Sequence, residues 1–214
     1  NQIDQTIKFT LENKGTLTFE PGGQLEYSSA PSHSLFHLKK QLESIQSQLT
    51  QLFKKHQSFF IQTGINPKET TKSLELQVTK DRYRCMDQYF KTISPYGQQM
   101  MRLTSAIHIN LDFSGNEHIL AKRYLASQLL TPFAAAIFAN SPLVQNNRTL
   151  CKGYRSKIWR FLDPTRTGFP PLEELGNQIN KHNCINSYLE FALKSNVAFI
   201  QRADILPVLK KTSL

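Results

Sequence analysis

The chain has 214 residues, of which 39% are apolar, and its formal net charge is +10. The charge indicates either an anionic partner or a basic surface that aids solubility. Because the basic residues are dispersed and no apolar run reaches the roughly 18 residues of a membrane span, we expect neither nucleic acid nor a membrane as a partner. The chain has three cysteines, Cys85, Cys151 and Cys184. They are too few and too far apart for a disulfide framework, which predicts a cytoplasmic protein.

Polar and apolar residues alternate over residues 16–20 and again over residues 24–27, on either side of a Pro-Gly-Gly sequence. A hairpin would explain the glycines, but Pro-Gly-Gly in a strand pattern is also typical of a bulge, a kink or a point where a ligand approaches the backbone. We interpret it as an interruption of one strand that leaves Glu20 and Glu26 on the same side. The two acids then belong either to a solvent-facing edge or to a site for a positively charged group.

A helical pattern follows, in which leucine and isoleucine recur at intervals of three and four residues between positions 35 and 52. Ser32 or Ser34 is the candidate N-cap. The apolar seam is compatible with a dimer, but its short length favours a helix that packs across a sheet. The next two segments predict a polar connector over residues 66–79 and a short amphipathic helix over residues 82–90.

Residues 100–115 carry the most informative pattern. Apolar side chains occupy the odd positions from Leu103 to Phe113, and the even positions carry Arg, Thr, Ala, His, Asn and Asp. This alternation predicts a long strand with one apolar face. An ordinary solvated face would carry Lys, Glu and Thr, so we interpret the polar face as functional, with Thr104, His108 and Asn110 on it.

Two later segments predict helices. Residues 117–139 predict a helix with Asn116 or Ser114 as the candidate N-cap, which Pro132 breaks or kinks, and its small, apolar second half is expected to be buried. Residues 172–202 are also expected to be largely helical.

Between these helices, residues 153–171 are rich in Gly, Pro, Arg and aromatic residues and predict a loop. It is either a basic surface loop or a clamp for phosphate or carboxylate, since arginine offers paired donors to planar oxyanions. Arg155 and Arg166 are the arginines that we single out.

Strands and helices that alternate without a regular βαβ rhythm predict an α+β fold with an antiparallel sheet, in a single domain over residues 1–214. The candidate groups form a coherent set. Carboxylates with a histidine can hold Mg²⁺ or Mn²⁺, and arginines neutralise charge on a transferring phosphoryl group. The chain has neither a GxxxxGK[ST] nor a GxGxxG loop, so the set predicts an ATP-dependent ligase that binds ATP in another way.

Five stretches of the chain resemble the glutamate–cysteine ligase family, in the same order, and most closely its plant and bacterial carboxylate–amine ligase branch. They are "FEPGGQLEYSSAP", "RYRCMDQYF", "MMRLTSAIHINLDFSG", "FANSP" and "YRSKIWRFLDPTRTGF". The resemblance implies a glutamine-synthetase-like open, mainly antiparallel sheet with helices on one face and the active site on the concave face. It also implies the reaction, in which ATP phosphorylates the glutamate γ-carboxylate and the cysteine amine displaces phosphate.

The resemblance further implies roles for individual residues. Glu20 and Glu26 resemble ligands of a magnesium or manganese ion that accompanies ATP, and His108 stands where a metal- or phosphate-contacting side chain is expected. The remaining expected contacts are with the substrates: Arg155 and Arg166 at a carboxylate or phosphate, Thr104 and Asn110 on the sheet face, and Trp159 at the pocket wall.

The chain departs from the family pattern towards both ends. No Glu-x-Glu pattern precedes residue 16, although family members carry further metal ligands there, and the family continues beyond Arg202. With a first residue that is not methionine, these departures predict a central portion of a ligase. Two hypotheses remain open: a ligase that is active when complete, as a homo-oligomer or with a complementing chain, or a remnant that binds nucleotide or a protein partner without ligation.

Overall fold

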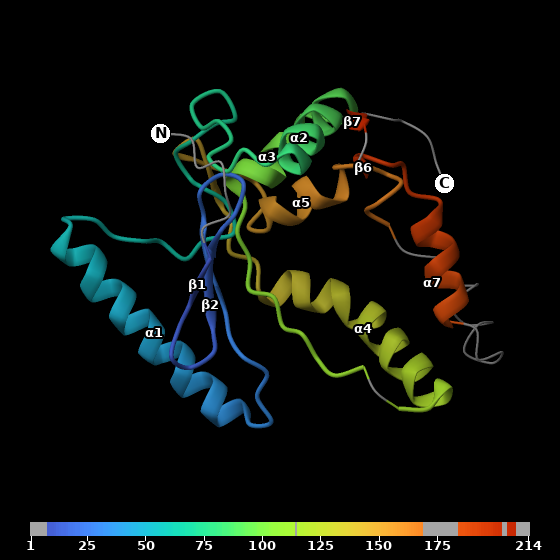
Figure 1. Ribbon diagram of the computed structural model, residues 1–214, viewed down its shortest axis with the longest axis horizontal. Coiled ribbons are helices and arrows are strands. Elements are labelled where there is room, and N and C mark those ends of the chain that lie inside the picture. The colour runs from blue at the N-terminus through green and yellow to red at the C-terminus, as the bar shows by residue number, and fades with distance from the viewer. Residues whose placement is uncertain (1–7, 114, 169–183, 203–204, 209–214) are drawn as a thin grey trace.

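The computed structural model describes residues 8–113, 115–168, 184–202 and 205–208 (Figure 1). These residues form an α+β fold, so the predicted fold class is confirmed. The strands are β1 (Phe9–Thr10), β2 (Thr16–Phe19), β3 (Leu25–Ser28), β4 (Leu143–Val144), β5 (Asn147–Arg148), β6 (Ile200–Arg202) and β7 (Ile205–Val208). The helices are α1 (Leu35–Lys55), α2 (Asp81–Ile93), α3 (Pro95–Leu103), α4 (Glu117–Ile137), α5 (Tyr154–Arg160) and α7 (Cys184–Leu193).

The β2 and β3 strands form an antiparallel hairpin, and β1 pairs with the other edge of β2. The turn closes through a hydrogen bond from the Glu20 amide to the Gln24 carbonyl, at 2.9 Å. Gly23 has a φ of +84°, a conformation that favours glycine. The interpretation of Pro-Gly-Gly as an interruption of one strand is therefore wrong: the sequence makes the turn of a hairpin, because it supplies the backbone reversal that joins two strands.

This turn packs against the end of α3 and the segment that precedes α2. The Pro21 carbonyl accepts hydrogen bonds from the amides of Gln77 and Val78, at 2.8 and 3.3 Å. The Gln24 side-chain amide donates to the Thr104 carbonyl at 2.9 Å. Gly22 lies so close to Arg102 that a Cβ there would meet the Arg102 carbonyl oxygen at 2.1 Å. The absence of a side chain at position 22 is thus what lets the hairpin dock.

The core of the molecule is built on α2, α3 and α5, with α3 packed against the other two (Figure 1). Ser94 joins α2 to α3: its amide donates to the Phe90 carbonyl, and its hydroxyl accepts from the Tyr96 amide. Two groups of buried apolar side chains lie here, one with Tyr89, Phe90, Met101, Leu162 and Ala198, the other with Ile65, Leu103 and Ile158.

The predicted helices are mostly confirmed, with one addition. Ser34 and Asn116, each one of two candidates, cap α1 and α4 with their side chains, and α2 covers the predicted helix at 82–90. The prediction of a loop over residues 153–171 is wrong for its first part, because Tyr154–Arg160 forms α5. Its single fully buried side chain, Ile158, packs into the core between basic residues, which a reading of charge alone does not reveal.

The long strand predicted in residues 100–115 is also wrong. Leu103 ends α3, Thr104 forms an isolated bridge with Ile65, and residues 105–113 have no regular structure. Ile107 is 90% exposed. Alternating polar and apolar residues give a strand its two faces, but a strand also needs a neighbouring strand whose backbone groups form hydrogen bonds with its own. For residues 106–111 the described part of the chain provides no backbone hydrogen bond.

Both long helices extend away from the core (Figure 1). In α1 only Ile45 is buried, so the seam predicted to pack across a sheet is largely exposed. In α4 the second half, expected to be buried, is exposed, and Phe133 and Phe138 lie on the surface. Pro132 is accommodated inside α4. The helix predicted over residues 172–202 is confirmed in part, by α7. Ile200–Arg202 is a strand instead, and residues 172–183 lie outside the described residues.

Candidate functional site

The hairpin brings two acidic side chains together. Thr18 and Glu26 are directly opposite in the β2–β3 register, and Glu20 follows Thr18 by two residues, so both acids project from the same face of the hairpin. The side chains of Glu20 and Glu26 share a hydrogen bond, which, with partial burial and the Glu26 charge, raises the pKa of Glu20 from 4.5 to about 7. The prediction that the two acids share one side thus holds, although a hairpin produces it.

The raised pKa gives this pair a definite effect on stability. Between pH 4.5 and about 7 the folded chain retains a proton that unfolded Glu20 has lost, so stability falls as the pH rises through this window and levels off above it. Glu20→Gln removes the repulsion. We expect the variant to be more stable than the wild type at pH 8 by about 1 kcal/mol, after allowance for solvent screening, and equal to it near pH 4.5.

Thermal unfolding at pH 4.5, 6 and 8 measures this effect. Glu43→Gln is the matched control, since Glu43 lies in an exposed ion pair on α1 and should change stability by less than about 0.5 kcal/mol at every pH. Equal melting temperatures of wild type and Glu20→Gln at pH 8 would contradict the raised pKa.

The three residues predicted on a polar strand face are separated by the structure. Thr104 is buried next to the hairpin, where its hydroxyl donates to the Met100 carbonyl at 2.7 Å and its carbonyl accepts from Gln24. His108 and Asn110 lie further along the irregular, exposed segment. Only Thr104 is therefore held close to the turn that carries the acid pair.

Arg155 lies on α5, near Thr104 through an intermediate strand-like pairing. Ile65 bridges to Thr104, and a Cβ added at the adjacent Gly64 would lie 3.4 Å from the Arg155 Cδ. The guanidinium is half-buried and stands 5.4 Å from the centre of the Trp159 ring. Its Nε has no hydrogen-bond partner among the described residues, and burial lowers the pKa of Arg155 from its ordinary value. A partly desolvated cation with an unused donor can bind an anion strongly.

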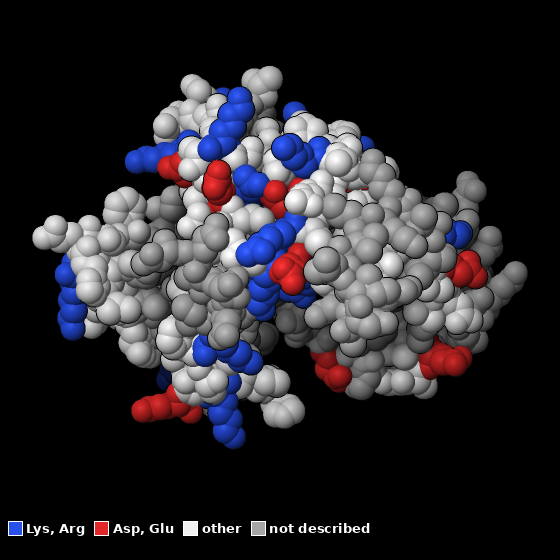
Figure 2. Space-filling model, turned by 45° about the horizontal axis from the view of Figure 1, so that its top comes forward, with Lys and Arg blue, Asp and Glu red and all other residues white. Residues whose placement is uncertain are grey.

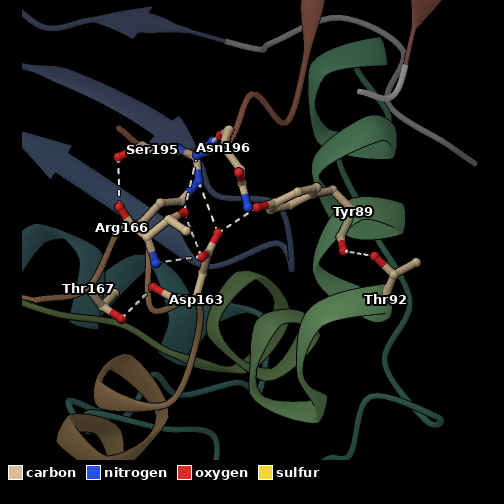
Figure 3. Close-up of polar contacts among 8 residues, drawn as sticks. Tyr89, Thr92, Asp163, Arg166, Thr167, Ser195 and Asn196 are labelled. Atoms are coloured by element: carbon tan, nitrogen blue, oxygen red, sulfur yellow. Dashed lines mark hydrogen bonds and ion pairs between the residues drawn. The ribbon is translucent and has the colours of Figure 1, made fainter. Parts of the chain in front are cut away.

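Arg166 belongs to a different cluster (Figure 3). Its Nε stands 3.4 Å from the Asp163 carboxylate, and its guanidinium donates to the Asn196 carbonyl. Asp163 also accepts a hydrogen bond from the Tyr89 hydroxyl at 2.7 Å. Sequence reasoning missed Asp163 and Tyr89. Asp163 lies in the motif "FLDPTRTGF" and Tyr89 in the motif "RYRCMDQYF", so the motifs that indicated the family contain both residues. No spacing rule predicts that residues so far apart in the chain come together.

The donor set fits a hard divalent cation in part. Carboxylate oxygens are the side-chain ligands that Mg²⁺ prefers, and one or two carboxylates with phosphate oxygens often suffice. Glu20 and Glu26 supply two, and like-charged groups held together are relieved by a cation between them. Within the described residues no group of three or more acidic, histidine or cysteine side chains is arranged to hold a metal, and His108 does not join the pair.

The basic side chains on the surface are interspersed with acidic ones. Figure 2 shows Lys and Arg scattered over one face of the molecule with Asp and Glu between them. No helix in the described part of the chain is long and apolar enough to cross a membrane.

An α+β chain with paired acids on a hairpin and a half-buried arginine, Arg155, on α5 fits the class of carboxylate–amine ligases. A family model described as "Glutamate-cysteine ligase family 2 (GCS2)" matches residues 2–192. The chain belongs to this family, which confirms the resemblance found in the sequence.

Curated relatives from plants are similar to most of the chain. "Glutamate--cysteine ligase, chloroplastic" of Medicago truncatula is 30% identical over 194 residues, 89% of this chain and 36% of the relative. The protein of the same name from Nicotiana tabacum is 30% identical over 194 residues, 89% of this chain and 35% of the relative. That of Arabidopsis thaliana is 32% identical over 160 residues, 75% of this chain and 30% of the relative. The chain thus spans about a third of the length of the curated relatives it matches.

These relatives also correct the predicted location. They are named chloroplastic, which contradicts the prediction of a cytoplasmic protein. The prediction rested on cysteine usage, which separates reducing from oxidising compartments. It does not separate one reducing compartment from another.

Proposed function

We propose that this chain is part of an ATP-dependent ligase that joins the γ-carboxylate of glutamate to the amine of cysteine. In this reaction a γ-carboxylate oxygen attacks the terminal phosphorus of ATP and ADP leaves, which forms γ-glutamyl phosphate. The cysteine nitrogen then attacks the acyl carbon, phosphate leaves, and the nitrogen loses a proton. Membership of the family and the names of the relatives support the proposal.

The observation that carries the proposal is the Glu20–Glu26 pair. Two carboxylates that share a proton near pH 7 are costly to the folded chain unless a cation joins them, so the hairpin is suited to hold Mg²⁺ or Mn²⁺. When bound, such an ion neutralises charge on the phosphate oxygens of ATP. Arg155, with its unused Nε donor, would bind a carboxylate or phosphate oxygen beside Trp159. Thr104 would line the site, and His108 and Asn110 would contact substrate from the exposed segment that follows α3.

A second candidate is a remnant that binds nucleotide or a protein partner without ligation. It is favoured by one finding: the described residues supply two acidic ligands to the site and no third. The ligase and a nucleotide-binding remnant share the nucleotide site and differ in turnover, so binding is measured first.

Isothermal titration of magnesium–ATP into the 214-residue chain at pH 6.5 tests the nucleotide site. We expect saturable, magnesium-dependent binding that Glu20→Gln weakens at least tenfold and that Glu43→Gln leaves unchanged. Because metal binding must displace the shared proton, the measured heat should vary with the ionisation enthalpy of the buffer for the wild type but not for Glu20→Gln.

The outcomes separate the candidates. Binding followed by glutamate- and cysteine-dependent release of ADP supports the ligase, and binding without turnover supports the remnant. If a folded chain shows no binding, or if Glu20→Gln binds as tightly as the wild type, the proposed metal–nucleotide site is wrong.

A further inference from the structure

The cluster around Asp163 joins segments that are far apart in the sequence. Tyr89 comes from α2, Asp163 and Arg166 follow α5, and Asn196 follows α7 (Figure 3). The Asn196 amide donates to the Thr165 hydroxyl at 3.2 Å, and the Arg166 guanidinium donates to the Asn196 carbonyl. The cluster therefore fixes the position of Arg166 relative to both the core and the C-terminal part of the chain.

Asp163 is the centre of this cluster. Its side chain is 1% exposed, and one carboxylate oxygen accepts hydrogen bonds from the Thr165 amide and hydroxyl, at 2.9 and 2.7 Å. The other accepts from the Tyr89 hydroxyl at 2.7 Å and faces Arg166 Nε at 3.4 Å. Burial alone would raise the pKa of Asp163, but the Tyr89 and Thr165 hydrogen bonds and the Arg166 charge together lower it. The carboxylate is thus ionised and fully partnered.

Arg166 is only partly used by these contacts. The Arg166 Nε forms an ion pair with Asp163, and Nη2 donates a hydrogen bond to the Asn196 carbonyl. The guanidinium stands 5.7 Å from the centre of the Tyr89 ring. For Nη1 the described residues provide no hydrogen-bond partner, and a third of the side chain remains exposed. One edge of the guanidinium is anchored, and the other remains available.

Arg102 offers an informative comparison. Its Nε and Nη2 donate to Asp87, at 2.9 and 2.6 Å, and its Nη1 donates to the carbonyls of Thr71 and Leu74, at 2.8 and 3.5 Å. All three of its nitrogen atoms are used within the protein, as expected of an arginine that serves the fold alone. Arg166 is also fixed by contacts through Nε and Nη2, but its Nη1 donates no hydrogen bond to the described residues.

We propose that Asp163 and Tyr89 are positioning residues that hold Arg166 so that its free edge binds an oxyanion of a substrate, a phosphate or a carboxylate. The inference rests on the proposed function for the identity of the substrates. A guanidinium offers paired donors to such groups, and fixing it beforehand lowers the entropy cost of binding.

The test follows the Nε–H signal of Arg166 by NMR in the ¹⁵N-labelled 214-residue chain, assigned by its loss in Arg166→Lys. The probes are inorganic phosphate, ATP without metal, and glutamate. We expect the signal to move in a saturable way with at least one of them. Movement with phosphate and ATP alone identifies a phosphate site, and movement with glutamate alone identifies a carboxylate site.

Tyr89→Phe tests the positioning itself, since it removes one hydroxyl and keeps the ring. We expect the affinity measured at Arg166 to fall about five- to tenfold, which is less than the full effect of a lost hydrogen bond to a charged group because Asp163 still faces Arg166. Thr92→Val is the matched control: Thr92 donates only to the Tyr89 carbonyl, so its loss leaves the cluster around Asp163 in place and the affinity unchanged.

Two results would overturn the proposal. No movement of the wild-type signal with any of the three anions rules out the oxyanion site, and unchanged affinity in a folded Tyr89→Phe rules out the positioning role. Neither result depends on magnesium–ATP binding at Glu20. A moving Arg166 signal in a chain that shows no Glu20-dependent binding would uphold the oxyanion site while the proposed function fails.

Discussion

Gly22→Ala should destabilise the chain by about 3 kcal/mol or more, the upper range for an overpacked site. A methyl group at this position would meet the carbonyl oxygen of Arg102 at 2.1 Å and its carbonyl and α carbons at 2.7 Å. These are backbone atoms at the end of α3, so no side-chain rotation relieves the collision. The hairpin would have to move away from α3, and the Glu20–Glu26 pair would move with it.

Urea unfolding measures the lost free energy of unfolding, and in thermal unfolding we expect the melting temperature to fall by about 6 to 12 °C for a chain of this size. Gly153→Ala is the control, because a methyl group there meets its nearest neighbour, the Ala139 side chain, at an ordinary 3.7 Å. Its stability should change by less than about 1 kcal/mol. If both variants unfold alike, the close approach of Gly22 to Arg102 is wrong.

The second large effect concerns the ion pair between Asp87 on α2 and Arg102 on α3. Both side chains are 11% exposed, and two hydrogen bonds, of 2.9 and 2.6 Å, join them. Gln98 donates a third to the Asp87 carboxylate at 2.9 Å. Arg102→Met should cost about 3 to 5 kcal/mol, because it leaves Asp87 buried without its counter-charge.

A double-mutant cycle distinguishes the pairing from simple loss of packing. In Asp87→Leu/Arg102→Met both charges are absent, so we expect it to be less destabilised than the sum of the single variants by about 2 to 3 kcal/mol. The exposed pair of Lys39 and Glu43 on α1 provides the comparison: Lys39→Met should cost less than about 0.5 kcal/mol. Additive single effects at Asp87 and Arg102 would contradict the coupling.

The Asp87–Arg102 pair also shows why two of the motifs occur together. Asp87 belongs to "RYRCMDQYF" and Arg102 to "MMRLTSAIHINLDFSG". The sequence pattern predicted that Arg102 lies on the polar face of a strand, which we interpreted as a functional surface. In the structure it lies in the last turn of α3 and holds α2 in place, so its charge serves the core that supports the hairpin.

The site could be predicted in part. The sequence brought Glu20 and Glu26 to one side because a strand's period of two survives on both arms of a hairpin. It also singled out Arg155, whose half-buried guanidinium the structure places next to Trp159. It did not separate Thr104 from His108 and Asn110, since it assigned all three to one strand. Their proposed roles in substrate binding remain predictions.

By itself the sequence determined the local structure: it narrowed the start of α1 to Ser32 or Ser34 and the start of α4 to Ser114 or Asn116, and it gave the side on which the paired acids project. These features depend on residues a few positions apart, where helical and strand periods and side-chain caps act. It also determined the family, through motifs in a fixed order. The tertiary structure alone decided which charges meet, namely Glu20 with Glu26 and Asp87 with Arg102, and that residues 105–113 form no strand. Such pairings depend on the free energy of bringing distant segments together, to which no periodicity in the sequence corresponds.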